Sequence, residues 1–107
     1  MLREPGHLVV TIGTTPEDST EIPMDQFAGG SFELPATSGT TAITPYAQVG
    51  GEAYGVMSDD DWQPVAAKSV SVSTPYPLPP NAYNYPRIKL VASAGTATDD
   101  VPVYKKS

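Results

Sequence analysis

Apolar and polar residues alternate in short runs along this chain, a two-residue period typical of strands with one buried face. The period is clearest over residues 69–73, where two valines alternate with three serines. Residues 87–92 repeat it, with Ile88, Leu90 and Ala92 directed inward and the basic residues between them directed outward. We therefore predict a half-buried strand at each place.

Runs of β-branched and aromatic residues, separated by glycine, proline and polar clusters, mark further strands. These predicted strands span residues 8–12, 21–24, 31–34, 41–49, 53–57 and 101–104. Gly50 and Gly51 are expected to form a hairpin turn, Asp99 and Asp100 a second turn, and residues 25–27 one helical turn. Proline donates no backbone hydrogen bond, so Pro45 should place its strand at a sheet edge or at a bulge.

Prolines crowd residues 74–80 and should hold that segment extended, because proline fixes its own φ and restrains the preceding residue. The segment is expected to be a rigid crossover between strands. Its PxxP motif at 77–80 also permits binding to an SH3-type domain.

Six to eight short strands without an amphipathic helix predict an all-β fold, an antiparallel β-sandwich or a jelly-roll-like barrel. The 107 residues suit one domain, residues 1–107, with short flexible arms at 1–6 and 104–107.

The composition excludes several classes of function without identifying one. The net charge is −6, and residues 1–61 carry ten acidic side chains and one basic one, whereas residues 62–107 carry two acidic and five basic ones. Scattered bases argue against nucleic-acid binding, and no apolar run is long enough for an export signal or a membrane span. Cysteine is absent, so disulfides and thiolate metal sites are excluded. We expect a protein made in the cytoplasm.

The chain offers little catalytic chemistry. His7 is the single histidine and has no partner at motif spacing, so we expect no enzyme activity and no cofactor. Asp59 and Asp61 stand two apart, as Ca²⁺ loops require, but the glycine and distal glutamate of an EF-hand loop are missing. A solvated turn is the stronger interpretation, and these two aspartates are weak metal candidates.

Aromatic residues are the main candidates for binding. Trp62 either packs in the core at the end of a sheet or, with the six tyrosines, forms a platform for sugars or an anchor at a protein interface. The tyrosines are at positions 46, 54, 76, 83, 85 and 104.

Several segments, taken in order over residues 20–95, resemble the small β-sandwich structural proteins of tailed bacteriophages that are encoded near the major capsid protein. They are Ile22-Pro23, residues 31–35 (SFELP), a Gly-Thr-Thr step before Ile43, residues 61–65 (DWQPV), 77–80 (PLPP) and 85–90 (YPRIKL). The heavy proline content at residues 75–80 departs from the more usual pattern of these proteins.

The resemblance implies a non-enzymatic virion component, a decoration or cement protein that stabilises the head at the capsid surface. Its partners would be the major capsid protein and further copies of itself, as a homo-oligomer on the capsid. Termini and aromatic-bearing loops are the expected contacts: Leu2, Arg3, Trp62, Tyr76, Tyr83, Tyr85, Tyr104 and Lys105. The alternative is a carbohydrate-binding or adhesion module of a fibre or tail that uses Trp62 and nearby tyrosines.

Overall fold

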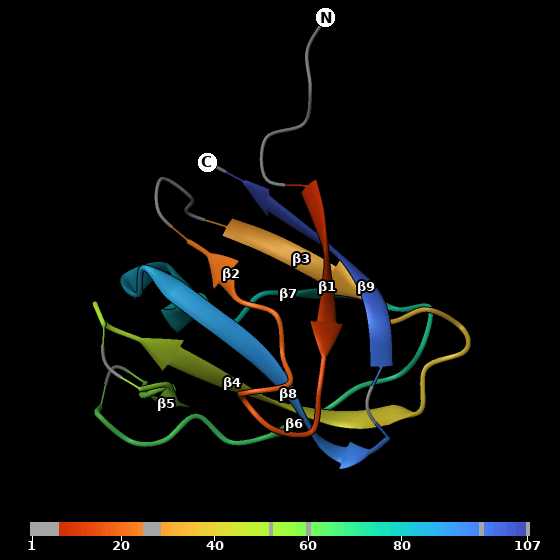
Figure 1. The fold of residues 1–107 in the computed structure, drawn as a ribbon, viewed down its shortest axis with the longest axis horizontal. Helices are drawn as coiled ribbons and strands as arrows, with labels where there is room; N and C mark the ends of the chain where they lie inside the picture. Colours follow the sequence, from red (N-terminus) through yellow and green to blue (C-terminus); the bar gives the residue numbers. More distant parts are fainter. Residues whose placement is uncertain (1–6, 25–28, 52, 60, 97, 107) are drawn as a thin grey trace, which may run out of the picture.

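The strands form two antiparallel sheets that face each other in a sandwich (Figure 1). A computed structural model describes residues 7–24, 29–51, 53–59, 61–96 and 98–106. The first sheet has the order β1 (His7–Ile12), β9 (Thr98–Lys106), β3 (Gly29–Glu33) and β7 (Pro75–Pro77). The second has the order β2 (Ile22–Pro23), β8 (Arg87–Gly95), β4 (Thr40–Gln48) and β5 (Gly55–Val56), and β6 (Lys68–Ser69) also pairs with β4. The predicted all-β sandwich is confirmed.

One core lies between the two sheets. From β8, Ile88, Leu90 and Ala92 point inward and are almost fully buried, as the alternation predicts. Val101 and Val103 of β9 join them from the opposite sheet. Each buried isoleucine, leucine or valine side chain contributes about 1.5–3 kcal/mol when it is removed from water, so this shared cluster holds the sheets together.

The C-terminal strand is longer and more central than its sequence suggests. Asp99 and Asp100 lie inside β9 rather than in a turn, and β9 pairs with β1 on one side and β3 on the other. Because β3 continues the ladder to Lys106, the prediction of a flexible arm from residue 104 is wrong for residues 104–106. Residues 1–6 and 107 lie outside the described residues.

Residues 69–73, which alternate most regularly in the sequence, contain only the last residue of a strand. β6 stops at Ser69, and the chain then turns, with Ser73 at a φ of 55° and its N–H donating to the carbonyl of Leu34 at 2.8 Å. Val72 is consequently 37% exposed, whereas the alternation predicts that it is buried on the same face as Val70. The strand predicted over residues 69–73 is wrong, because bonds to residues distant in sequence bend this segment away from a ladder.

Pro45 lies inside a strand that is paired on both sides, not at an edge. Its carbonyl accepts from the N–H of Met57 at 3.0 Å, so the proline nitrogen also faces away from β8. On that side the partners of β4 are β5 and β6, which pair only with residues 46–47 and 42–43. Pro45, which has no backbone N–H to donate, lies between the residues that pair with β5 and those that pair with β6. The irregular register with β8 occurs at Thr40–Ile43 instead.

The remaining connections agree better with the sequence. Gly50, with a φ of 63°, and Gly51 form the predicted turn between β4 and β5. The proline-rich segment crosses from β7 of the first sheet to β8 of the second through the short 3-10 helix η1 (Pro80–Asn84). The helical turn predicted at residues 25–27 lies outside the described residues. Within the ranges described, no helix is long and apolar enough to cross a bilayer.

Candidate functional site

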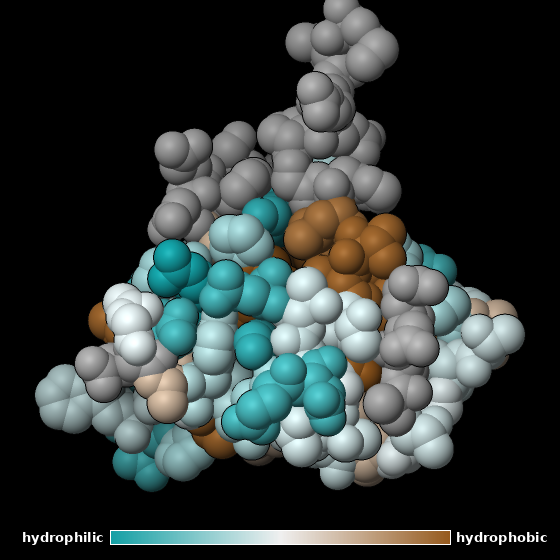
Figure 2. All heavy atoms as spheres, in the orientation of Figure 1, coloured by the Kyte–Doolittle hydropathy of each residue, from teal (hydrophilic) through white to brown (hydrophobic). Residues whose placement is uncertain are grey.

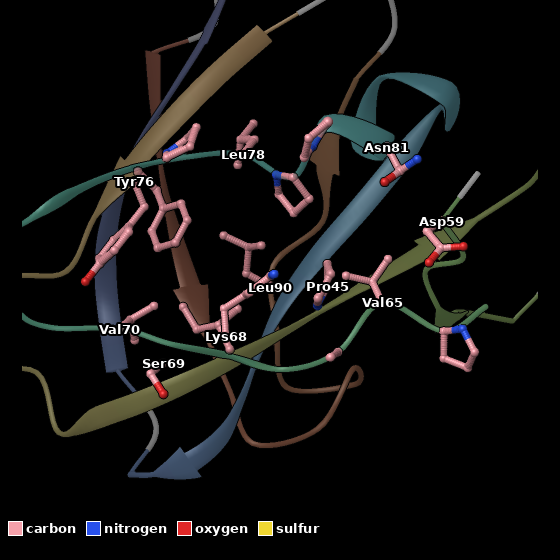
Figure 3. A pocket seen from close by; sticks show the side chains of 17 residues that line it. Pro45, Asp59, Val65, Lys68, Ser69, Val70, Tyr76, Leu78, Asn81 and Leu90 are labelled. Atoms are coloured by element: carbon pink, nitrogen blue, oxygen red, sulfur yellow. The ribbon is translucent and has the colours of Figure 1, made fainter. Parts of the chain in front are cut away.

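An apolar cleft of about 640 Å³ opens between the sheets on the side where β7 and β6 lie (Figure 3). Tyr76 and Leu78 extend into it from the proline-rich segment, and Val65 and Val70 line it from the segment around β6. Its remaining lining side chains include buried core residues and residues nearer the surface: Phe32, Ile43, Pro45, Leu90, Asp59, Lys68 and Asn81. The cleft is of the size that accepts a small apolar group.

The rim of this cleft includes a tight turn that Asp59 shapes with its own carboxylate. Oδ1 of Asp59 accepts from the backbone N–H of Asp61 at 2.9 Å and from that of Gln63 at 3.0 Å. Backbone bonds close the same turn, since Asp59 N–H donates to the carbonyl of Gln63 at 2.8 Å. An aspartate that accepts from backbone groups two and four residues ahead stiffens the turn.

This use of Asp59 confirms the predicted turn between strands. Nowhere in the described ranges do three His, Cys, Asp or Glu side chains gather closely enough to hold a metal ion. The weak metal candidates Asp59 and Asp61 therefore form no complete ligand set with other described residues, and Asp60 lies outside them.

Trp62 stands at the tip of this turn and is 88% exposed. Its φ of 64° lies in the left-handed region, where a side chain is strained, and this backbone directs the indole away from the sandwich. Packing of Trp62 in the core, one of the sequence-based interpretations, is wrong. The Asp59 carboxylate accepts from backbone N–H groups on both sides of Trp62, so the turn holds this backbone in place.

The six tyrosines do not gather around Trp62. Among the described residues the single ring pair is Phe32 with Tyr76, at 5.7 Å between ring centres and 31° between planes. The hydroxyl of Tyr76 accepts from the N–H of Ser71 at 2.7 Å, and Tyr83 and Tyr85 pack against the core. The extended aromatic platform is therefore not assembled in this part of the chain.

Tyr54 belongs to a polar cluster on the outer face of β8 that sequence reasoning missed. Its hydroxyl donates to Glu21 at 2.7 Å, and the ammonium of Lys89 lies 4.5 Å from its ring centre. Glu21 also forms an ion pair with Arg87 at 3.5 Å. Burial, then the hydrogen bond to Glu21, then the negative charge of Glu21 raise the pKa of Tyr54 well above its usual value. The cluster ties the segment before β2 to β8.

The other predicted contact residues have diverse positions. Lys105 is only 5% exposed, and its ammonium donates to the carbonyl of Pro23 at 2.6 Å, so its side chain is not a surface contact. Tyr104 is half-buried within β9. Leu2 and Arg3 lie outside the described residues. Among the described residues of the predicted set, Trp62 is thus the strongly exposed one, and its turn borders an apolar cleft.

No family model, curated protein or solved structure matches this chain.

Proposed function

We propose that this chain is a non-enzymatic structural protein of a phage virion, a decoration protein that binds the lattice of the major capsid protein. The exposed indole of Trp62 carries the proposal. Tryptophan is among the residues that contribute most to protein interfaces when a partner's pocket buries it. The sequence resemblance to small phage structural proteins supports the choice of partner.

The strained backbone at Trp62 argues that the exposure of its indole serves a function. A non-glycine residue in the left-handed region costs about 1–2 kcal/mol, and glycine at this position would remove that cost. Trp62 also leaves a large apolar surface in water. A stiff turn that holds such a side chain outward reduces the entropy lost on binding, which suits an anchor for a rigid partner.

The apolar cleft adds a second element to the same contact surface. Asp59 both lines the cleft and closes the turn that carries Trp62. A projecting ring and a neighbouring hollow give a partner surface the interlocking shape that characterises well-packed interfaces. A decoration protein needs such a surface and no reaction chemistry.

Sugar binding is the alternative, because an exposed indole also stacks on the apolar face of a sugar. The tyrosines expected to extend such a platform are distributed over both sheets. We therefore favour a protein partner, and a glycan array with wild-type protein and Trp62→Gly tests the alternative. Binding that depends on Trp62 would replace our proposal.

The main experiment is co-sedimentation with capsids of the virus that encodes the chain, using Trp62→Gly and Ser73→Gly. Both residues have a positive φ, so both substitutions relieve strain and should raise stability. Only Trp62→Gly should lose capsid binding. Failure of the wild-type protein to sediment with capsids, or equal binding by both variants, would overturn the proposal.

A further inference from the structure

The edges of the two sheets differ in how well they are protected from pairing with another strand. An unpaired edge presents backbone donors and acceptors to any strand that approaches it, and proline or a short edge prevents this. β7 has proline at two of its three positions, Pro75 and Pro77. β2 has two residues, one of them Pro23, and β5 and β6 have two residues each.

β1 is the exception. It has six residues, HLVVTI, without proline, aspartate, glutamate, lysine or arginine, and within the described residues it pairs with β9 alone. Val9 is 56% exposed on its outer face. Figure 2 shows hydrophobic atoms gathered over the beginning of this strand. β1 therefore lacks every device that protects the other edges.

The open part of this edge can be located from its hydrogen bonds. The N–H of Thr11 donates to Oγ1 of Thr20 at 3.0 Å, and the carbonyl of Thr11 accepts from the N–H of Thr20 at 2.9 Å. Both groups of Thr11 thus point away from β9. Because this direction alternates along a strand, the backbone groups of Val9 and His7 also face the open edge. The extra residue in the irregular register belongs to β9, so β1 keeps its alternation.

We propose that β1 pairs in antiparallel orientation with β1 of a second copy of this chain, with the two-fold axis beside Leu8. In this register His7 of each copy lies opposite Val9 of the other. Their four N–H groups and four carbonyls then form four hydrogen bonds, and none competes with Thr20. The first sheet of one copy continues into the first sheet of the other.

A second copy fits this edge because the open segment is complementary to itself. His7 and Val9 present their backbone groups to the open edge on either side of Leu8, so an antiparallel copy centred on Leu8 brings the same groups opposite them, and Leu8 then lies opposite Leu8 of the second copy. Val9, which is 56% exposed on the outer face, lies beside the second strand in this register, so pairing removes part of its apolar surface from water. The chain has a net charge of −6, but β1 contains no Asp, Glu, Lys or Arg. Two copies that pair through β1 therefore place none of these charged residues directly opposite one another.

Cross-linking tests this register directly, because the chain has no cysteine. Directly opposed residues of a pair without hydrogen bonds have Cα atoms about 4.5 Å apart, within the range of about 4.4–6.8 Å that disulfides span. Leu8→Cys should therefore form a disulfide dimer under mild oxidation. Val49→Cys is the control, since Val49 is 63% exposed and lies outside the strands. We expect cross-linking at position 8 to be about tenfold faster or more.

Sedimentation velocity of the wild-type protein over a concentration series provides a second measurement that needs no substitution in the half-buried Leu8. The sedimentation coefficient should rise with concentration, and Val9→Lys should abolish the rise while Val49→Lys preserves it. A coefficient that stays constant for the wild type would overturn the proposal and leave the edge to a strand of another protein. Equal cross-linking at positions 8 and 49 would also overturn it. Neither experiment involves Trp62, so the decoration function can fail separately.

Discussion

Gly30 in β3 has a close packing role that a single added methyl group should reveal. A Cβ at this position would lie 2.6 Å from the backbone carbonyl oxygen of Tyr104 and 2.6 Å from Cδ1 of Leu78. Leu78 can shift, but Tyr104 belongs to the central strand β9, whose backbone is held by ladders on both sides. Gly30→Ala must therefore separate β3 from β9 locally.

Overpacking of this kind costs about 1–3 kcal/mol. For a domain of this length, about 1 kcal/mol corresponds to roughly 4 °C in melting temperature, so we expect Gly30→Ala to melt about 4–12 °C below the wild type. Gly55→Ala is the matched control, because Gly55 is also a strand glycine but has no atom within 4 Å of the added Cβ. It should be neutral or stabilising by less than about 1 kcal/mol.

Thermal unfolding should be followed by far-ultraviolet circular dichroism. Trp62 is already 88% exposed in the folded state, so its fluorescence is a poor reporter of unfolding. A Gly30→Ala protein that melts within about one degree of the wild type, or a Gly55→Ala protein that loses as much stability, would refute the packing argument.

Three further substitutions test other contacts. Ser19→Ala removes the buried hydroxyl that accepts from Gly13 N–H at 2.9 Å, and urea unfolding should show a loss of about 1–3 kcal/mol. Tyr54→Phe tests the raised pKa of Tyr54: above pH 10 the unfolded tyrosine ionises while the folded one keeps its proton, so wild-type stability falls. The difference in the free energy of unfolding between the wild type and Tyr54→Phe, measured in urea, should therefore shrink as pH rises from 9 to 11. A difference that stays constant would contradict this. Asp59→Ala should lower the melting temperature more than Asp59→Asn, which retains an acceptor for the turn, and equal losses would disagree with the bonding described.

The fold was predictable where local pattern and long-range pairing agree. Residues 87–92 alternate, and β8 also has neighbours on both sides that maintain this alternation. Residues 69–73 alternate more regularly, yet Ser73 bonds to Leu34 and Ser71 to Tyr76, and these bonds prevent a ladder. Periodicity describes which face a strand would bury and not whether a partner strand is present.

The candidate site was less predictable than the fold, because its features depend on backbone geometry. The sequence indicates a turn at Asp59. The side to which Trp62 points follows from its positive φ, and a non-glycine residue gives no sign of a positive φ in the sequence. The burial of Lys105 depends in the same way on the extension of β9 and on the carbonyl of Pro23. Only the tertiary pairing brings these groups together.

The protected edges determine what size of assembly the chain can build through its sheets. A protein with two open edges adds further copies at each end, so its pairing continues into a ribbon or fibre. With β7 closed by proline and β1 open, pairing of two β1 strands uses the available edge of both copies. In the proposed pair, growth therefore stops at two copies, because the prolines of β7 would prevent a further strand from pairing there. Replacement of both prolines by threonine should then allow copies to add in an open-ended series.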